Sequence, residues 1–413
     1  MRIDEVRKPE RAQWGKPLEG VRILAAEQMQ ALPYATQLMA HLGADVIKVE
    51  HPRDGESGRG ARPTIVDTDG REVGATYLRN NLSKRSIGID LKSARGAALF
   101  RRLARCVDVV AENFRPGTMA RLGLGYEALA TASPRLVYVS VSGFGNLEDS
   151  PYASWPAYAP IPEAMAGFYE QNRRDGERPR ALVAGALGDI GSGMFAVIGT
   201  LAALRHRERT GLGQHVDIAM FDAMVAMADM VPFMASIGAP RISSGGPWII
   251  DSFRAQDGFF VLEVIRDNHL HQLARAIGRP EWIDDPRFAD RARWPEYLEP
   301  IFRPAIEAWA AGRTKLAACH ELARHGVAAG PSNTADDLRA DPHVALRNML
   351  IEVPRPDSDE PLQVVGNPVK LSRAADGPVR RFPTLGEHTD LVLRELLALD
   401  DDEIAALRAD GAI

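Results

Sequence analysis

One aspartate, Asp189, stands among glycines in the stretch GALGDIGSGM (residues 185–194), directly before a long apolar run. This position is typical of a helix N-cap, where a carboxylate accepts hydrogen bonds from the first backbone N–H groups. The alternative is a reacting carboxylate that a substrate must approach closely, with glycines leaving the space that a Cβ would fill. From this stretch alone we favour the N-cap, because aspartate is among the commonest residues there.

Few other residues have the type and spacing that chemistry requires. His269 and His271 form a close pair, but no further ligand cluster lies at a useful spacing, so we expect surface histidines and no metal site. Cys106 and Cys319 lie in helix-like segments and are too few for a disulfide framework or a cysteine metal site.

Length and composition narrow the class of protein. The chain has 413 residues, which predicts two or three domain-sized units, and 45% of them are hydrophobic. The formal net charge is −5, from 50 basic and 55 acidic residues, so no overall field attracts nucleic acid or an anionic membrane. The N-terminus is charged throughout, unlike a signal peptide, and the longest apolar run, 193–204, is too short to span a bilayer. We expect a cytoplasmic protein without nucleic-acid or membrane partners.

The elements that would position Asp189 alternate between strand and helix, which predicts an α/β fold with a mostly parallel sheet. We expect buried strands at 20–27, 44–50, 85–91, 107–113 and 135–144, and helices at 31–43 and 93–106. From 189 to 238 the chain reads as helical, with a break at 207–214. We divide the chain into a leader (1–16), a large domain (17–224), a small domain (225–330) and a segment that returns to the large domain (331–413).

Five methionines lie three or four residues apart after the glycine-rich stretch: Met220, Met224, Met227, Met230 and Met234. A cofactor site or a partner surface can carry such a stripe, but a core-facing side of a helix is the commoner cause. We expect a core face.

Seven stretches of the sequence resemble the class III CoA-transferases, the family of the formyl-CoA:oxalate and carnitine CoA-transferases. They are PLEGVRIL (17–24), LGADVIKVEHP (42–52), NLSKRSIGIDLK (81–92), ENFRPGTMARLGLGYEAL (112–129), GALGDIGSGMFAVIGTLAALRHRERTGLGQHVDIAMFDAM (185–224), GPSNTADDLRADPHV (330–344) and GEHTD (386–390). They occur in the family's order and cover nearly the whole chain after residue 16. The resemblance implies a Rossmann-like large domain with a parallel sheet, a smaller inserted α/β domain and two subunits interlocked as a homodimer. It also implies that Asp189 is catalytic, and this reverses our preference for the N-cap.

The resemblance implies that the Asp189 carboxylate acts as a nucleophile. Asp189 attacks an acyl-CoA donor, which gives a mixed anhydride and releases the CoA thiolate. The thiolate then attacks the anhydride and forms an aspartyl-CoA thioester. A carboxylic acid acceptor finally takes the CoA from this thioester. Neither ATP nor a metal is needed, and no cofactor is bound permanently, because CoA enters as a substrate. Backbone N–H groups near Gly188 and Gly191 would stabilise the oxyanions of these steps.

The resemblance also implies where CoA binds. Its phosphates need basic side chains or helix N-termini. The matching positions are Gln30, Ala31, Ile89, Asp90, Leu91, Lys92, Asn113, Phe114, Arg115 and Arg121. For any single arginine, a solvated basic surface is the alternative. His388 also matches the family, but a contact at a helix start would account for it equally well.

Several positions depart from the family and bear on the choice of activity. The racemase relatives, which act on α-methylacyl-CoA, carry a Gly-His-Asp triplet where this chain has Ala157-Tyr158-Ala159, so racemization lacks its second base. Many transferases carry an acid at Ala159 and a glutamine at Glu163, and a glycine is common at Leu32.

A catalytically idle acyl-CoA-binding protein is the third hypothesis, although a pure binder has no need of Asp189. Within the small domain, Arg241 or Arg254 could pair with a second carboxylate and Trp248 could supply apolar bulk. This composition favours a dicarboxylic acid such as succinate as one substrate.

Overall fold

The computed structural model describes residues 1–147, 149–173, 176–182, 185–238 and 246–413. The chain forms two compact units. The large unit comprises Met1–Glu170, Pro179–Pro232 and His343–Ile413, and the small unit comprises Gln171–Arg178 and Phe233–Pro342. The main segment of the small unit, Phe233–Pro342, therefore begins and ends later than the expected 225–330, and residues 225–228 belong to a helix that packs on the large unit.

A six-stranded parallel sheet forms the centre of the large unit. Its order is β5 (Arg85–Gly88), β2 (Asp45–Glu50), β1 (Arg22–Ala26), β6 (Val109–Glu112), β7 (Val137–Ser142) and β8 (His215–Ala219). The predicted α/β class with a parallel sheet is confirmed. The prediction of only helices between 189 and 238 is wrong, since β8 pairs with β7 from Tyr138↔His215 to Ser142↔Ala219. This strand has five residues and is buried only at its end, so its apolar pattern is weak.

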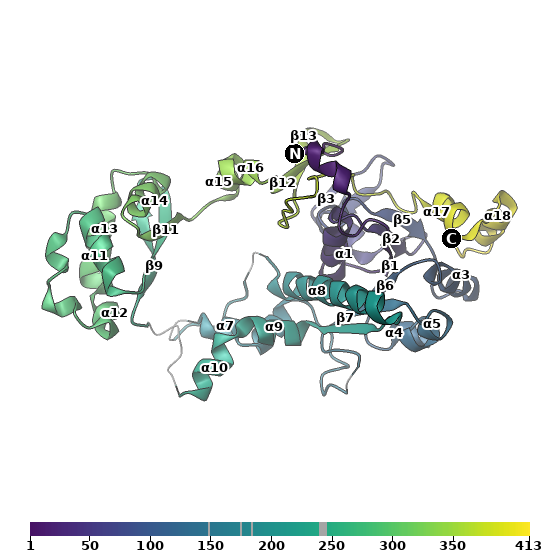
Figure 1. The fold of residues 1–413 in the computed structure, drawn as a ribbon, viewed down its shortest axis with the longest axis horizontal. Coiled ribbons are helices and arrows are strands. Elements are labelled where there is room, and N and C mark those ends of the chain that lie inside the picture. Colours follow the sequence, from purple (N-terminus) through teal and green to yellow (C-terminus); the bar gives the residue numbers. More distant parts are fainter. Residues whose placement is uncertain (148, 174–175, 183–184, 239–245) are drawn as a thin grey trace. The chain divides into compact units, whose positions relative to one another are not determined.

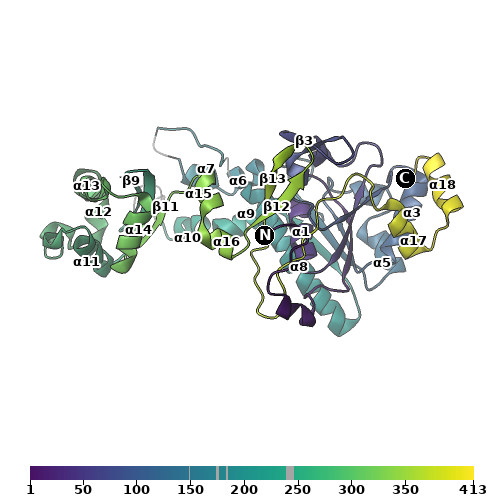
Figure 2. The ribbon, with the colours of Figure 1, turned by 90° about the horizontal axis from the view of Figure 1, so that it is seen from above.

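Two helices cover one face of this sheet. They are α1 (Ala31–His41) and α8 (Leu187–Thr210), which lie side by side in Figures 1 and 2. Buried residues of both helices, such as Leu32 and Ala196, pack against Ile23 and Val139 of the strands in one apolar cluster. The helices approach closely because Gly193 has no side chain: a Cβ there would lie 2.7 Å from the Ala31 carbonyl oxygen.

The other face of the sheet is covered by helices from both ends of the chain. They are α3 (Ala94–Ala104), α4 (Thr118–Arg121), α5 (Tyr126–Ala132), α17 (Thr389–Leu397) and α18 (Asp401–Ala409). Phe100 of α3, Leu129 of α5 and Val392 of α17 are buried in the same cluster as Ile87 and Val110 of the strands. Burial on both faces explains why the strands read as continuous apolar runs.

Shorter elements complete the large unit. The sheet β12 (Leu350–Arg355) and β13 (Ser358–Val365) packs with Tyr77 and Leu78 of α2 (Ala75–Leu78) in a separate cluster. The remaining elements are β3 (Thr64–Val66), β4 (Glu72–Gly74), α6 (Pro160–Met165), α9 (Met220–Ala228) and α16 (Pro342–Leu346), with α7 (Phe168–Gln171) and α10 (Met230–Ser236) at the boundary between the units.

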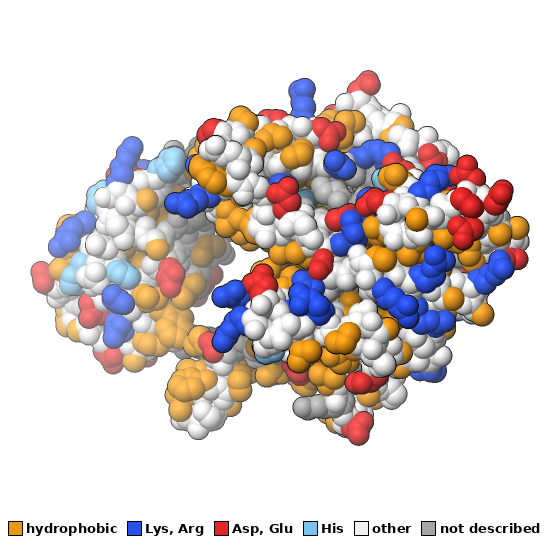
Figure 3. All heavy atoms as spheres, turned by 45° about the vertical axis from the view of Figure 1, so that its right-hand side comes forward, with side chains coloured by type: hydrophobic (Ala, Val, Ile, Leu, Met, Phe, Trp, Pro, Cys, Tyr) orange, Lys and Arg blue, Asp and Glu red, His pale blue; other side chains and the backbone are white. Residues whose placement is uncertain are grey.

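Helix α8 is longer than the apolar run that the sequence suggested. Within the described part of the chain, it is the one helix long and apolar enough to cross a membrane, with 24 residues and a mean hydropathy of 1.6 over an 18-residue window. Buried helices of globular proteins meet the same criterion, and α8 contacts α1, α9 and β7. The helix is therefore only weak support for a membrane span. On the face drawn in Figure 3, acidic and basic side chains are interspersed, as the small net charge of −5 suggests.

The small unit has its own antiparallel sheet and apolar core. The sheet order is β11 (Ala328–Pro331), β10 (Gly258–Val264) and β9 (Ile249–Ala255). Its helices are α11 (Asp267–Ala276), α12 (Trp294–Tyr297), α13 (Arg303–Ala310), α14 (Lys315–Arg324) and α15 (Ala335–Ala340). Phe253, Phe260, Trp294 and Phe302 are fully buried in its core.

The methionine stripe divides between two helices. Met220 and Met224 of α9 are buried, as expected for a core face. Met230 of α10 is 46% exposed, and every described residue of α10 is at least partly exposed. The expectation of one continuous core face is therefore correct only for α9, because the chain breaks between the helices at Asp229, which has a φ of 24°.

Candidate active site

Asp189 is the third residue of α8 and not its N-cap. The N-cap is Ala186, which has a left-handed conformation with φ 38° and makes no side-chain cap bond. The preceding Gly185 also has a positive φ, of 101°, so the chain turns sharply into the helix. An acidic residue in the first turn of a helix is stabilised by the partial positive charge of that end. The N-cap interpretation of Asp189 is therefore wrong.

The Asp189 side chain faces a cavity of about 140 Å³ at the carboxyl ends of β1, β6 and β7. Ligands of doubly wound sheets bind at this edge. Six of the predicted residues line the cavity together: Gln30, Ala31, Asn113, Phe114, Arg115 and Asp189. The residues that the sequence analysis did not select are Gln28, Met29, Pro116, Val141, Ser142, Gly143, Trp155, Pro156, Ala157, Tyr158 and Met220.

The loops that follow β1 and β6 are tied together beside this cavity. The Gln28 backbone N–H donates to the Asn113 Oδ1 at 2.8 Å, and the Asn113 Nδ2 donates to the Gln28 backbone carbonyl at 2.9 Å. Met29 has a positive φ of 61° and donates its N–H to the Glu56 Oε2 at 2.9 Å. This strained residue turns the chain into α1, so Gln30 and Ala31 face the cavity. Asn113 thus has a structural role as well as a place in the wall.

The environment of Asp189 raises its pKa from 3.8 to about 6. Burial is the largest cause because it disfavours the charged form, and the negative charge of Glu163 adds to it. The positive charge of Arg79 acts in the opposite direction. No donor among the described residues makes a hydrogen bond to the Asp189 carboxylate. The carboxylate is therefore unusually basic, and its oxygens are free to react.

Arg79 is a residue of the site that the sequence analysis missed. Its guanidinium donates to the Gln30 Oε1 at 2.7 Å, which fixes the amide at the N-terminal end of α1. Among the described residues, it is also the one basic residue that affects the pKa of Asp189. Arg79 lies two residues before the family-like stretch that begins at Asn81, and nothing but its charge distinguishes it in the sequence.

Glu163 contacts the residue next to Asp189. Its side chain is buried, with 1% exposure, and its Oε1 accepts the Gly188 N–H at 2.9 Å. The Tyr169 hydroxyl donates to the other carboxylate oxygen. In this structure the Gly188 N–H is therefore already bonded, and its oxyanion role stays a prediction. The Asp189 and Ile190 N–H groups both donate to the Ala186 carbonyl, and Gly191 lies beyond the first four N–H groups, those that a helix leaves without an intrahelical partner.

Protein atoms lie close to two of the glycines beside Asp189, Gly188 and Gly191. A Cβ on Gly188 would lie 2.8 Å from both the Cα and the carbonyl oxygen of Ala159. A Cβ on Gly191 would lie 2.5 Å from the Met227 sulfur. At Gly188 the close atoms belong to the backbone, so glycine is needed there; at Gly191 they are the ends of methionine side chains, which can shift. The space that we attributed to a reacting molecule is thus filled by α9 and by the residue before α6.

The remaining predicted CoA contacts do not line the cavity. Ile89, Asp90, Leu91 and Lys92 follow β5 at the edge of the sheet, where the Asp90 N–H donates to the Ala412 carbonyl. Arg121 ends α4 and is exposed; its guanidinium donates to the Thr118 Oγ1 at 3.0 Å. Contact of these residues with CoA therefore stays a prediction.

Other candidate residues have structural surroundings. The His388 Nδ1 accepts the Ser86 N–H at 3.3 Å at the start of α17. In the small unit, the Arg254 guanidinium packs over the Phe259 ring at 4.9 Å. Arg241 lies outside the described residues. No group of three or more His, Cys, Asp or Glu within the described ranges is placed to hold a metal ion, and His269 and His271 belong to no such group.

A parallel sheet with helices on both faces and a cavity at its carboxyl edge defines a doubly wound α/β protein. Comparison with known proteins identifies its family. Residues 18–389 match the family model described as CoA-transferase family III, and the chain belongs to that family.

Relatives match this chain over nearly their whole length. The succinate–glutarate CoA-transferase of Agrobacterium fabrum is 36% identical over 93% of this chain and 96% of its own. The formyl-CoA:oxalate CoA-transferase of Streptomyces avermitilis is 34% identical over 96% of this chain and 100% of its own. The crystal structure of a CaiB/BaiF family protein from Brucella suis superposes with a TM-score of 0.80 at 32% identity, over 92% of this chain and 99% of that one. The expected family is confirmed.

Proposed function

We propose that this CoA-transferase works through Asp189 as its nucleophile. The observation that carries the proposal is that the Asp189 carboxylate faces a cavity with five other family-matching residues and has no hydrogen-bond donor among the described residues. With a pKa of about 6, about nine-tenths of the carboxyl is ionised at pH 7. An ionised, poorly solvated carboxylate is the form that attacks a thioester carbonyl.

The exchange proceeds in four transfers. An Asp189 oxygen attacks the thioester carbonyl, the C–S bond breaks, and a mixed anhydride and the CoA thiolate result. The thiolate attacks the Asp189 acyl carbon, which releases the first acid as its carboxylate and leaves an aspartyl-CoA thioester. The incoming carboxylate attacks that thioester, and the released thiolate attacks the substrate half of the new anhydride. Asp189 is thus regenerated, and no oxidant, metal or ATP enters the balance.

The CoA moiety is held by the large unit in this proposal. Arg115 supports it because it is the only basic residue lining the cavity within the described part of the chain. Charge-assisted contacts from Arg115, Arg121 and Lys92 would bind the phosphates. Gln30, Ala31, Asn113 and Phe114 would contact the neutral arm, with Ile89, Asp90 and Leu91 beyond it.

A dicarboxylic acid is the proposed acceptor or product. The relatives reported above are named for succinate, glutarate and oxalate, all of which are dicarboxylic acids. A racemase is disfavoured because neither Tyr158 nor Ala159, which stand where the racemases carry His-Asp, replaces the second base; Ala159 has no proton acceptor and packs against Gly188. An idle acyl-CoA binder would not need an unpaired, basic Asp189.

A cytoplasmic homodimer with interlocked subunits completes the proposal. Exposed apolar side chains on α8 support an interface, since Met194, Ile198 and Leu201 are 41%, 60% and 38% exposed on one side of the helix. Light scattering at low micromolar concentration should give the mass of a dimer. An active monomer would contradict this part of the proposal.

The test of the nucleophile combines trapping with substitution. Enzyme mixed with succinyl-CoA and hydroxylamine should lose activity, and mass spectrometry should find a hydroxamate at Asp189. Asp189→Asn should fold normally and lose exchange by several orders of magnitude, whereas Glu208→Gln, an exposed control on the same helix, should remain active. A folded Asp189→Asn variant with near-normal exchange, free of deamidation, would refute the mechanism. Loss of α-deuterium from a 2-methylacyl-CoA would instead indicate a racemase.

A further inference from the structure

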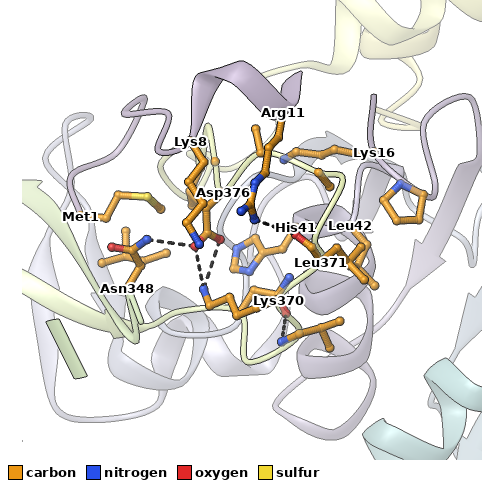
Figure 4. A pocket seen from close by; sticks show the side chains of 18 residues that line it. Met1, Lys8, Arg11, Lys16, His41, Leu42, Asn348, Lys370, Leu371 and Asp376 are labelled. Carbon is orange, nitrogen blue, oxygen red and sulfur yellow. Dashed lines mark hydrogen bonds and ion pairs between the residues drawn. The ribbon is translucent and has the colours of Figure 1, made fainter. Parts of the chain in front are cut away.

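A second, smaller cavity lies in the large unit at the opposite end of α1 from Asp189's cavity (Figure 4). It is enclosed by the N-terminal segment, the last turn of α1 and residues 367–379. Its volume is about 30 Å³, room for about two water molecules. Helix α1 has 11 residues, so the two cavities are separated by about 16 Å of helix. Nothing in the proposed transfer uses it.

Positive charge surrounds this second cavity. Four basic residues line it, Lys8, Arg11, Lys16 and Lys370, against a single acidic residue among the described ones, Asp376. Figure 4 shows their side chains gathered around His41. The Asp376 carboxylate is already engaged by the Lys370 Nζ, at 2.9 and 3.1 Å, and by the Asn348 Nδ2 at 2.9 Å.

The acidic residues next to the cavity balance only part of this charge. Glu10 lies 3.8 Å from the Arg11 Nε, and the Glu19 carboxylate accepts the backbone N–H of Lys16. No carboxylate within salt-bridge distance of the Lys16 ammonium is found in the described residues. Burial lowers the pKa of Lys16, with Asp376 and Glu19 opposing that change. The cations are therefore held together without enough anions to pair them.

His41 is independent evidence that this cavity binds a ligand. It is 8% exposed, lines the cavity, and neither ring nitrogen has a hydrogen-bond partner among the described residues. Burial, followed by the charges of Lys16, Lys84 and Lys370, lowers its pKa to about 4, so the ring is neutral at pH 7 and keeps one N–H to donate. Buried polar groups in native proteins are normally hydrogen-bonded. We therefore expect a hydrogen-bond acceptor to bind the His41 imidazole in this positively charged cavity.

We propose that this cavity, formed by His41 with Lys8, Arg11, Lys16 and Lys370, binds a small tetrahedral oxyanion of the phosphate type. A water molecule would satisfy His41 but would leave the cations unbalanced. A phosphate dianion can accept hydrogen bonds from the imidazole N–H and from several cations at once. Inorganic phosphate and a phosphate group of CoA share this chemistry. The site does not depend on the role of Asp189.

Binding of inorganic phosphate to the full-length protein tests the proposal directly. Calorimetric titration at pH 7.5, in buffer of constant ionic strength set with chloride, should show saturable binding. Lys16→Met should weaken the dissociation constant at least tenfold. Arg2→Gln removes an exposed charge from the same N-terminal segment without lining the cavity, and it should leave binding unchanged. If Lys16→Met fails to fold, as judged by circular dichroism, Lys8→Met replaces it, since Lys8 is exposed.

The outcomes separate the two sources of the phosphate group. Displacement of bound inorganic phosphate by CoA, lost in Lys16→Met, would assign the cavity to a phosphate of CoA. Phosphate binding that CoA does not displace would assign it to the free ion. Absence of phosphate binding, or equal binding by the wild type and the folded lysine variants, would overturn the proposal. Exchange activity is not needed for any of these readouts, so failure here and failure of the proposed mechanism are distinguishable.

Discussion

Neutralising Glu163 should move the acid limb of the activity profile to lower pH. Burial and the Glu163 charge together raise the pKa of Asp189 from 3.8 to about 6. This shift corresponds to about 3 kcal/mol between the two protonation states. At pH 5, about one-tenth of Asp189 is ionised in the free enzyme, so kcat/KM should lie about tenfold below its plateau.

Glu163→Gln tests the electrostatic part of this shift. The glutamine keeps an oxygen that can accept the Gly188 N–H, but it has no negative charge. The pKa of Asp189 should fall, because one of its two raising causes is removed, and the loss of kcat/KM at pH 5 should become smaller than tenfold. Burial remains, so the limb should not reach the ordinary value of 3.8.

Initial rates of CoA transfer between pH 4.5 and 8 measure the limb, with Glu208→Gln as the control for an exposed charge on α8. The control should keep the wild-type limb. A wild-type limb near pH 4, or a limb that does not move in Glu163→Gln, would refute the electrostatic argument. A limb that moves equally in both variants would show an effect of net charge only.

Three other substitutions test different contacts. Asp189→Asn should raise the free energy of unfolding by about 3 kcal/mol at pH 7.5 and by about 1 kcal/mol at pH 4.5, as measured in urea titrations. The reason is that folding raises the pKa of Asp189, so the penalty for burying the ionised carboxyl is lost as pH falls from 6 to 3.8. An equal gain at both pH values would contradict this. Gly188→Ala should lower the free energy of unfolding by about 1–3 kcal/mol and reduce activity, because its Cβ meets the backbone of Ala159. The control Gly312→Ala should be near neutral, since its Cβ has no described atom within 4 Å. Similar melting temperatures of the two variants would contradict this. Arg121→Ala should raise the KM for the CoA thioester by roughly ten- to a hundredfold, the loss expected for one charge-assisted phosphate contact. The KM for the free acid should stay nearly unchanged. A parallel change in both KM values would exclude a phosphate contact.

Continuous apolar runs made most of the central sheet predictable. Strands buried on both faces, such as β1 and β6, carry this signal in their own residues. Strand β8 does not, because it lies at the edge of the sheet and is half-buried along most of its length. Its place depends on pairing with β7, a long-range contact that local pattern does not contain.

Only those residues of the candidate site that lie in stretches resembling the family could be predicted. Asp189 and Asn113 were found in this way, and both line the cavity. Glu163 was noted only as an unusual residue, because its bond to the Gly188 N–H joins positions that are distant in sequence. Arg79 was missed for the same reason, since its partner Gln30 lies far from it in the sequence, at the start of α1. A sequence shows that a glycine lacks a side chain, but it does not show which neighbour occupies that space.

The close packing around the start of α8 limits how the enzyme can be redesigned. Gly188, Gly191 and Gly193 each face a different neighbour, so α8 contacts the residue before α6, then α9, then α1. A library that varies Gly188 or Gly193 to change substrate choice would mostly yield misfolded protein, because added atoms collide with backbone atoms of Ala159 or Ala31. Trp155 and Tyr158 also line the cavity that Asp189 faces, and they should tolerate substitution better because they are 52% and 68% exposed. Changes in acid specificity should therefore be sought there, while the helix that carries the carboxylate is left untouched.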